Sequence, residues 1–268
     1  MSIPPLALLS GLIVRIGLAL GWYGNFDGYD LAALALLSHG PATYLTSAFY
    51  GIRPVTASAY LGVDVVSSFL PFFLLRQLSN AHSAAPDVDN REIITDRGIQ
   101  LLTSLLSGLI LNVVLFLASR TFLPTVLVLY FNGIPTIIPA VDAILLGIGN
   151  PPTLALSLLF GVAARTFIFT PVVTTPRSEK EEQELAEFDP VTASLSETVI
   201  YNIWGFSSKT KVSINRTAVA MLYAGVGTYL RCALEINGVE SFGAAVYAGI
   251  FVVATAVTGL TLRYVGSV

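Results

Sequence analysis

Five ionisable side chains lie well inside long apolar segments of this sequence. A charged group at the centre of a membrane helix costs about 2.5–3.5 kcal/mol on insertion scales, so such groups are expected to face one another or a water-filled cavity. Arg165 lies near the end of its segment, where its long side chain can reach water. Arg231 lies one turn from Glu235, and an i, i+4 ion pair accounts for it. The five are Arg15, Asp64, Asp142, Arg165 and Arg231.

Arg15, Asp64 and Asp142 are therefore the informative set. Asp64 falls near the expected membrane midplane, and the other two fall toward the outer half. One arginine between two carboxylates at similar depth predicts a buried charge network. As a functional site, this network would serve a proton- or ion-coupled solute. As a structural network, it would fix helix packing, with the third charge reaching water. The sequence leaves both interpretations open.

An apolar segment near Asp142 is interrupted by helix breakers. Gly133, Pro135 and Pro139 lie within residues 131–152. Proline removes a backbone donor and leaves carbonyls of the preceding turn without partners. Such a break persists in lipid only where protein or trapped water satisfies those groups. Broken helices form the sites of many transporters, and the structural alternative is a proline kink in a long helix.

The sequence lacks the usual motifs of enzymes and metal centres. It contains no HExxH, GxSxG or P-loop pattern. Its two histidines, His39 and His82, are far apart and have no cysteine partners, so we predict no zinc site. Asp27 and Asp30 in the turn NFDGYD could hold a hard cation, but two carboxylates in one turn fit a solvated connection better. There is thus no positive indication of an enzyme, a metal or a cofactor.

The composition indicates a membrane protein. Of 268 residues, 54% are hydrophobic and 12% are charged, whereas soluble domains average about 25% charged residues. A soluble chain of this size could not cover its exterior with so few polar groups, so lipid is the expected surrounding. The formal net charge of -3 does not indicate a nucleic acid partner.

Eight segments are long enough to cross a bilayer core, which requires about 20 apolar residues of helix. We therefore predict an all-α, polytopic integral membrane helical bundle of seven or eight transmembrane helices, with residues 1–268 as a single membrane domain. Two segments are less regular than the others: the second contains His39-Gly40-Pro41, and the fifth is 28 residues long. The predicted spans are 3–22, 31–50, 55–75, 99–118, 122–149, 152–170, 214–234 and 242–262.

Basic residues predict the orientation, because Lys and Arg favour the cytoplasmic side. With eight spans and the amino terminus inside, eight basic residues fall inside and three outside. This arrangement predicts cytoplasmic amino and carboxyl termini. It makes residues 76–98 an outer polar loop and residues 171–213 an inner polar loop. A short amphipathic helix is expected near 190–204, where apolar residues recur at four-residue spacing.

Small residues predict close packing of the last two spans. Ala220 and Ala224 are four residues apart, as are Ala244 and Ala248. This spacing lets helices approach closely, either within one chain or between two copies.

Two classes of function remain open. The leading interpretation is an accessory, assembly or scaffold protein whose spans bind other membrane proteins or a second copy of the chain. The alternative is a small-solute or ion transporter with a site near the broken fifth span. A wet cavity lined by Arg15, Asp64 and Asp142 would favour transport, and mutually paired charges in a dry core would favour the accessory role.

Overall fold

The computed structural model describes residues 19, 21–83, 90–141, 150–176, 194–196, 198 and 208–267. Within these ranges the chain is helical apart from turns, connections and one isolated bridge between Phe131 and Val239. The all-α prediction is therefore confirmed for the described residues.

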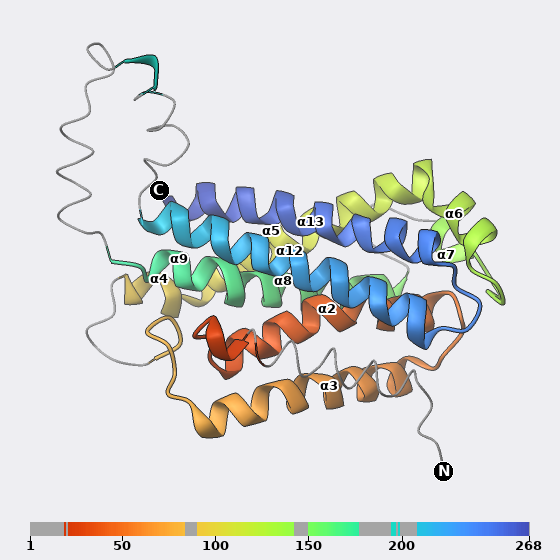
Figure 1. Cartoon of the computed structure of the whole chain (residues 1–268), viewed down its shortest axis with the longest axis horizontal. Helices are drawn as coiled ribbons and strands as arrows, with labels where there is room; N and C mark the ends of the chain where they lie inside the picture. Colours follow the sequence, from red (N-terminus) through yellow and green to blue (C-terminus); the bar gives the residue numbers. More distant parts are fainter. Residues whose placement is uncertain are drawn as a thin grey trace.

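Long helices run alternately in opposite directions along one bundle (Figure 1). Short helices lie between them near the two ends of the bundle. The long elements are α2 (Gly28–Ala48), α3 (Pro54–Leu75), α5 (Arg97–Thr121), the continuous unit of α8 (Pro151–Ala164), the π-helix η2 (Arg165–Phe169) and α9 (Thr170–Val173), then α12 (Ser208–Glu235) and α13 (Ser241–Ser267). The short elements are α4 (Arg91–Thr95), α6 (Leu123–Tyr130) and α7 (Ile138–Val141).

Five helices are long and apolar enough to cross a membrane, judged by length and composition. They support a helical membrane protein, whereas the total of seven or eight spans stays a prediction. Most of the predicted first span, 3–22, lies outside the described residues. The five are Pro54–Leu75, Arg97–Thr121, Pro151–Val173, Ser208–Glu235 and Ser241–Gly266.

Helix α2 lies at the centre of the bundle, although it is not one of these five. It packs against α3, α8 and α12, and thirteen of its 21 residues are buried. Because protein surrounds it, α2 can carry Asp30 and His39 without exposing them to lipid.

The predicted fifth span, 122–149, is wrong as a single helix. Helix α6 ends at Tyr130, and the chain turns at Gly133, whose φ of +78° places it in the left-handed region. Helix α7 then covers only Ile138–Val141, and residues 142–149 lie outside the described part of the chain.

Protein groups satisfy the backbone at this break. The Asn132 N–H donates to the Gly238 carbonyl at 2.8 Å, and the Glu240 N–H donates to the Tyr130 carbonyl at 2.9 Å. The break is therefore fastened to the connection between α12 and α13 at one end of the bundle. This arrangement meets the requirement that broken backbone be satisfied by protein.

The two long polar segments approach each other at the other end of the bundle. The side-chain amide of Asn90 donates to the Val173 carbonyl at 3.0 Å. The sequence-based topology put residues 76–98 and 171–213 on opposite sides of the membrane, and the sides of these loops stay a prediction. The predicted amphipathic helix near 190–204 lies almost entirely outside the described residues.

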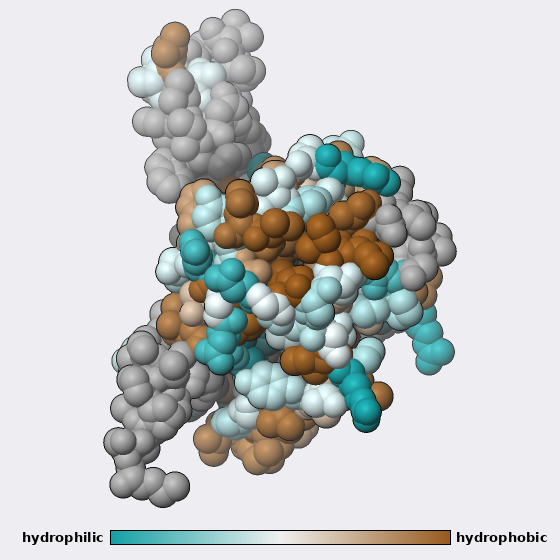
Figure 2. Space-filling view, turned by 90° about the vertical axis from the view of Figure 1, so that its right-hand side faces the viewer, coloured by the Kyte–Doolittle hydropathy of each residue, from teal (hydrophilic) through white to brown (hydrophobic). Residues whose placement is uncertain are grey.

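We name the two ends of the bundle by one residue each. The Asp27 end comprises residues 24–30, 76–83, 90–97, 170–176, 208–216 and 262–266, and the Arg53 end comprises residues 49–53, 119–141 and 235–241. Figure 2 looks onto the Arg53 end, where hydrophilic residues are scattered among hydrophobic ones.

The small residues of the last two helices pack inside the chain. Ala220, Ala224 and Ala244 are fully buried, and Ala248 is nearly so. Helices α12 and α13 pack against each other along their length. The intramolecular interpretation of this pattern is therefore confirmed for these four residues.

Helices α5 and α8 approach each other most closely at two glycines. A Cβ on Gly108 would lie 2.6 Å from the Ser157 carbonyl oxygen, and one on Gly161 would overlap the Ser104 carbonyl oxygen. Beside them, the Ser157 hydroxyl donates to the Asn112 side-chain oxygen at 2.9 Å. The contact thus depends on two glycines and one buried hydrogen bond.

Replacing Gly161 by Ala is expected to destabilise the protein by about 1–3 kcal/mol, the usual cost of overpacking, because backbone atoms cannot move aside as a flexible side chain can. Gly62→Ala in α3 is the matched control, since nothing lies within 4 Å of its Cβ position. Thermal unfolding of the detergent-purified variants compares the two. Equal melting temperatures for both variants would show that α5 and α8 do not pack at this distance.

Candidate functional site

Asp64 is the centre of a charged cluster inside the bundle. It is the eleventh of 22 residues in α3, and its Oδ2 lies 2.9 Å from Arg231 Nη1 in α12. His39 Nδ1 in α2 lies 3.2 Å from the same oxygen. Arg231 also contacts Glu235 at 3.5 Å. Three helices thus bring one carboxylate, one imidazole and one guanidinium together.

The cluster is largely enclosed by protein. The side chains of Asp64, His39 and Arg231 are 17%, 13% and 11% exposed. His39 Nδ1 and Asp64 Oδ2 are buried, and their contacts have ion-pair distances without hydrogen-bond alignment. Buried polar atoms are normally hydrogen-bonded, so such an exception requires an explanation.

A cavity of about 330 Å³ lies beside this cluster, on the side of the Arg53 end. Arg231 and Glu235 line it, and so do hydroxyl groups from α2 and α3. The Arg231 guanidinium lies 5.5 Å from the centre of the Tyr60 ring, a cation–π distance. The hydroxyl-bearing residues are Thr43, Thr46, Thr56 and Tyr60.

The sequence identified one member of this site and missed its partners. Asp64 is half-buried beside Arg231 and His39, whereas Arg15 and Asp142 lie outside the described residues. The predicted network of Arg15, Asp64 and Asp142 therefore stays a prediction. The ion pair between Arg231 and Glu235 is confirmed. Because Glu235 already accounted for Arg231 within α12, the sequence did not indicate that Arg231 also pairs with Asp64 of α3.

A second charged cluster lies at the Asp27 end, where the prediction of a solvated turn is wrong. The side chains of Asp27 and Asp30 are 2% and 0% exposed. The two residues form a capping box at the start of α2, in which the Asp30 N–H donates to Asp27 Oδ1 at 3.0 Å. Both carboxylates then reach distant parts of the chain.

Asp27 receives hydrogen bonds from the connection after α3. The Ser79 hydroxyl donates to Asp27 Oδ2 at 2.6 Å, and the Ser79 N–H donates to it at 3.0 Å. His82 Nδ1 lies 2.7 Å from the same oxygen. The start of α2 is thereby fastened to residues 79–82.

Asp30 is paired with Arg216 at the start of α12, with an Nη1–Oδ1 distance of 2.5 Å. The guanidinium lies 4.9 Å from the centre of the Phe26 ring and 4.8 Å from that of Phe167. Arg216 Nη1 also donates to the Phe167 carbonyl at 3.4 Å. Pro171 has no N–H to offer that carbonyl, which lies four residues before it.

Ligand atoms of Asp27, Asp30 and His82 lie within 4.8 Å of one another, a spacing that a metal ion could use. The protein already supplies positive or hydrogen-bonding partners to both carboxylates, however. Arg216 neutralises Asp30, and Ser79 with His82 satisfies Asp27. These contacts join the start of α2 to α12 and to residues 79–82 without requiring a metal. We call this set of contacts, made by Asp27, Asp30, Ser79, His82 and Arg216, the charge lock.

Burial alone would raise the pKa of the Asp27 carboxyl. Its hydrogen bonds with His82, Ser79 and the Asp30 N–H, together with the charge of His82, outweigh burial. The pKa therefore lies well below its ordinary value of 3.8. A carboxyl with a depressed pKa stabilises the folded state above its unfolded pKa, and the contribution is lost as the pH falls toward the folded pKa.

Replacing Asp27 by Asn is therefore expected to lower stability by about 1.5–3 kcal/mol near neutral pH, the usual worth of hydrogen bonds to a charged group. The deficit should shrink as the pH falls below about 4, because the wild-type carboxyl then becomes protonated in the unfolded state. Melting temperatures of both proteins measured across this pH range give the difference. A deficit that is constant with pH would show that the Asp27 charge is not the stabilising element.

The fold and its buried charges define a class, that of helical membrane proteins with charged side chains enclosed in the bundle. Comparison with known proteins adds no narrower identity: no family model, no curated protein and no solved structure matches this chain.

Proposed function

We propose that this protein is a small-solute or ion transporter whose site is the cluster of Asp64, His39 and Arg231. The observation that supports this most directly is the position of Asp64, at the middle of an apolar helix and paired to Arg231 beside a cavity. Intramembrane carboxylate and histidine groups commonly mark proton relays and ion pathways.

The charge balance of the cluster indicates what it would carry. Asp64 and Glu235 contribute two negative charges and Arg231 one positive charge, so neutral His39 leaves one negative charge in excess. An unbalanced charge is costly where the dielectric constant is low. A proton on His39 or a small cation in the adjacent cavity restores the balance. We therefore propose a proton or a small cation as the transported or coupling species.

We further propose seven spans. Helix α2 is 21 residues long, about 31 Å at 1.5 Å per residue, which matches the bilayer core. Adding α2 to the five apolar helices gives six, and the sequence-predicted span 3–22 gives seven. The site would then lie near the midplane, since Asp64 and His39 are central in their helices.

Basic residues support an orientation with the Asp27 end in the cytoplasm. Among the described residues, seven Lys and Arg side chains belong to that end and two to the Arg53 end. This proposal keeps the carboxyl terminus cytoplasmic, as the sequence predicted. With seven spans, however, the amino terminus falls on the opposite side. The seven are Arg76, Arg91, Arg97, Lys209, Lys211, Arg216 and Arg263, and the two are Arg53 and Arg120.

Transport is tested by reconstituting the purified protein into sealed liposomes that contain a pH-sensitive dye. Proton, sodium and potassium gradients are imposed in turn, with and without a membrane potential. We expect dissipation of at least one gradient well above that of protein-free liposomes. The proposal would be contradicted if liposomes with the wild-type protein dissipated every gradient no faster than protein-free liposomes.

The accessory or scaffold role is the second candidate, because the described charge clusters are paired within the chain. In that case Asp64 and Arg231 would serve only to fix the packing of α3 against α12. The two roles differ in their response to a neutral, isosteric change at Asp64. Such a change would impair accumulation in the membrane if the pair is structural, and flux alone if it is a transport site.

A further inference from the structure

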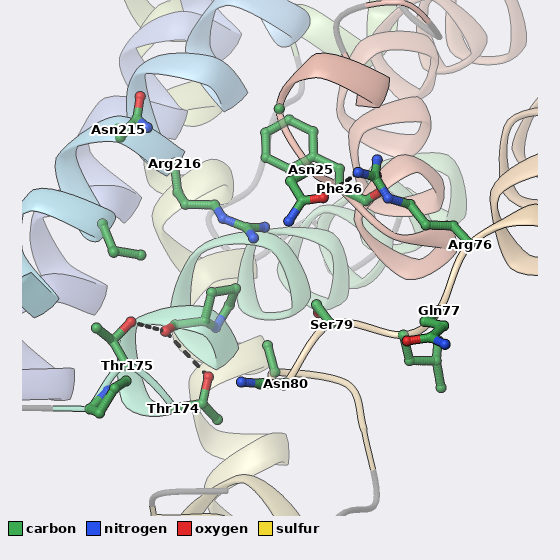
Figure 3. Close-up of a pocket in the computed structure, with 16 residues that line it drawn as sticks. Asn25, Phe26, Arg76, Gln77, Ser79, Asn80, Thr174, Thr175, Asn215 and Arg216 are labelled. Carbon is green, nitrogen blue, oxygen red and sulfur yellow. Dashed lines mark hydrogen bonds between the residues drawn. The ribbon is translucent and has the colours of Figure 1, made fainter.

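A second, larger cavity opens at the Asp27 end, and Figure 3 shows the residues that line it. Its volume is about 610 Å³, within the range of about 300–1,000 Å³ typical of small-molecule sites. We propose that this cavity binds a phosphate-bearing anion, either a soluble phosphate ester or a phospholipid headgroup. The inference does not rest on the transport proposal, because the residues that carry it belong to the Asp27 end and none of them is a member of the Asp64 cluster.

Arg76 supplies a positive charge that no described carboxylate neutralises within ion-pair distance. Its Nη1 donates to the carbonyls of Gly21, Trp22 and Phe26 at 3.4, 3.2 and 3.2 Å. Its Nη2 donates to the side-chain oxygen of Asn25. Neutral oxygens thus fix the guanidinium in place while leaving its charge available. A preorganised cation of this kind is suited to bind an anion.

Arg216 brings a second guanidinium to the same cavity. In Figure 3 the guanidinium groups of Arg76 and Arg216 lie on either side of Asn25 and point toward each other. Asp30 holds one side of Arg216, and the Phe26 and Phe167 rings flank it. Its orientation is therefore set before any ligand arrives.

The remaining lining is uncharged and mixes polar side chains with apolar ones such as Phe26, Leu78 and Val212. None of the 16 described lining residues is Asp or Glu. The amide groups of Asn25 and Asn80 face the cavity. Guanidinium groups bind phosphate oxygens through charge-assisted N–H donors. A phosphate group therefore fits this lining better than a neutral or cationic ligand does.

The test measures binding to the purified full-length protein held in phosphatidylcholine nanodiscs. Glycerol 3-phosphate is the soluble probe, and isothermal titration calorimetry measures its binding. Nanodiscs that contain phosphatidic acid supply the headgroup probe, and the shift in the melting temperature of the protein measures its binding. Binding of the soluble ester assigns the site to a free ligand, and stabilisation by phosphatidic acid alone assigns it to a lipid. Absence of both effects overturns the proposal.

Two variants make the assignment specific. Arg76→Gln removes the available charge and is expected to weaken binding at least tenfold, whereas Arg53→Gln, an exposed arginine at the other end, should leave it unchanged. Asn80→Asp places a carboxylate at an exposed lining position and should also weaken binding, with the fold intact even if Arg76→Gln does not accumulate. Binding by Asn80→Asp equal to that of the wild type would overturn the proposal.

Discussion

Replacing Arg216 by Met is expected to lower the apparent melting temperature by about 10 °C, the equivalent of about 3–5 kcal/mol for a chain of this size. The reason is Asp30, whose side chain is fully buried and whose cationic partner is Arg216. Removing that partner leaves an uncompensated carboxylate inside the protein, which costs far more than the loss of an exposed ion pair. The measurement is thermal unfolding of the purified variant, with the folded protein that remains after heating quantified by size-exclusion chromatography.

A double variant distinguishes the lost charge from lost packing. Asp30→Asn together with Arg216→Met removes both members of the pair and leaves no unpartnered carboxylate, so most of the stability should return. Lys211→Met, an exposed change in the same part of α12, should shift stability by no more than about 0.5 kcal/mol. If Arg216→Met alone were as stable as the wild type, the charge lock at the Asp27 end would not exist.

Replacing Asp64 by Asn is expected to reduce flux at least about tenfold, to the level of empty liposomes, while the protein still accumulates and folds. The asparagine keeps the size of the side chain but loses the charge and the ability to take up a proton. Arg231 still has Glu235 as its partner, so the variant contains a balanced pair and no isolated buried charge. The measurement is gradient dissipation by reconstituted variant and wild type at equal protein density.

Glu240→Gln is the matched control for that experiment, because it neutralises an exposed carboxylate at the Arg53 end without touching the cluster. It should transport like the wild type. Wild-type flux by Asp64→Asn would remove Asp64 from the transport site. Failure of Asp64→Asn to reach the membrane would instead favour the structural role of the pair and the accessory function.

The apolar helices were predictable because one local property determines them. The segment 55–75 nearly coincides with α3, and 242–262 lies within α13, which continues to Ser267. Both were found because a run of about 20 apolar residues forms a helix wherever lipid is the solvent. Helix α12 begins at Ser208, six residues before the predicted 214. Hydropathy detects only the apolar stretch, whereas the polar first turns continue the helix beyond it.

The fifth segment was mispredicted because hydropathy ignores backbone geometry. Its residues are apolar enough for lipid, but Gly133 and the prolines around it end the helix and fold the chain back along the Arg53 end. The stabilising partners of that turn, Gly238 and Glu240, are about 100 residues away. No local pattern reveals them.

The charged sites show the same limit. Asp27 and Asp30 resemble a solvated turn when only neighbours in sequence are considered. In the structure they are buried and pair with His82 and Arg216, which belong to distant parts of the chain. Asp64 was identifiable because a carboxylate in the middle of an apolar helix requires a partner. Which residue supplies that partner depends on the packing of α2, α3 and α12, which spacing alone does not determine.

If the Asp64 cluster is a transport site, the cavity beside it must admit water from the Arg53 end, and thiol labelling at Thr43 tests whether it does. Thr43 lines the cavity one turn from His39, and the native Cys232 is buried and can be replaced by Ala. A membrane-impermeant, cationic methanethiosulfonate reagent is applied to liposomes that contain Thr43→Cys in the Cys232→Ala background. We expect the reagent to modify the new cysteine and the flux to fall as modification proceeds. A cysteine that stays unmodified at full reagent excess, or flux that is unchanged after complete modification, would contradict it.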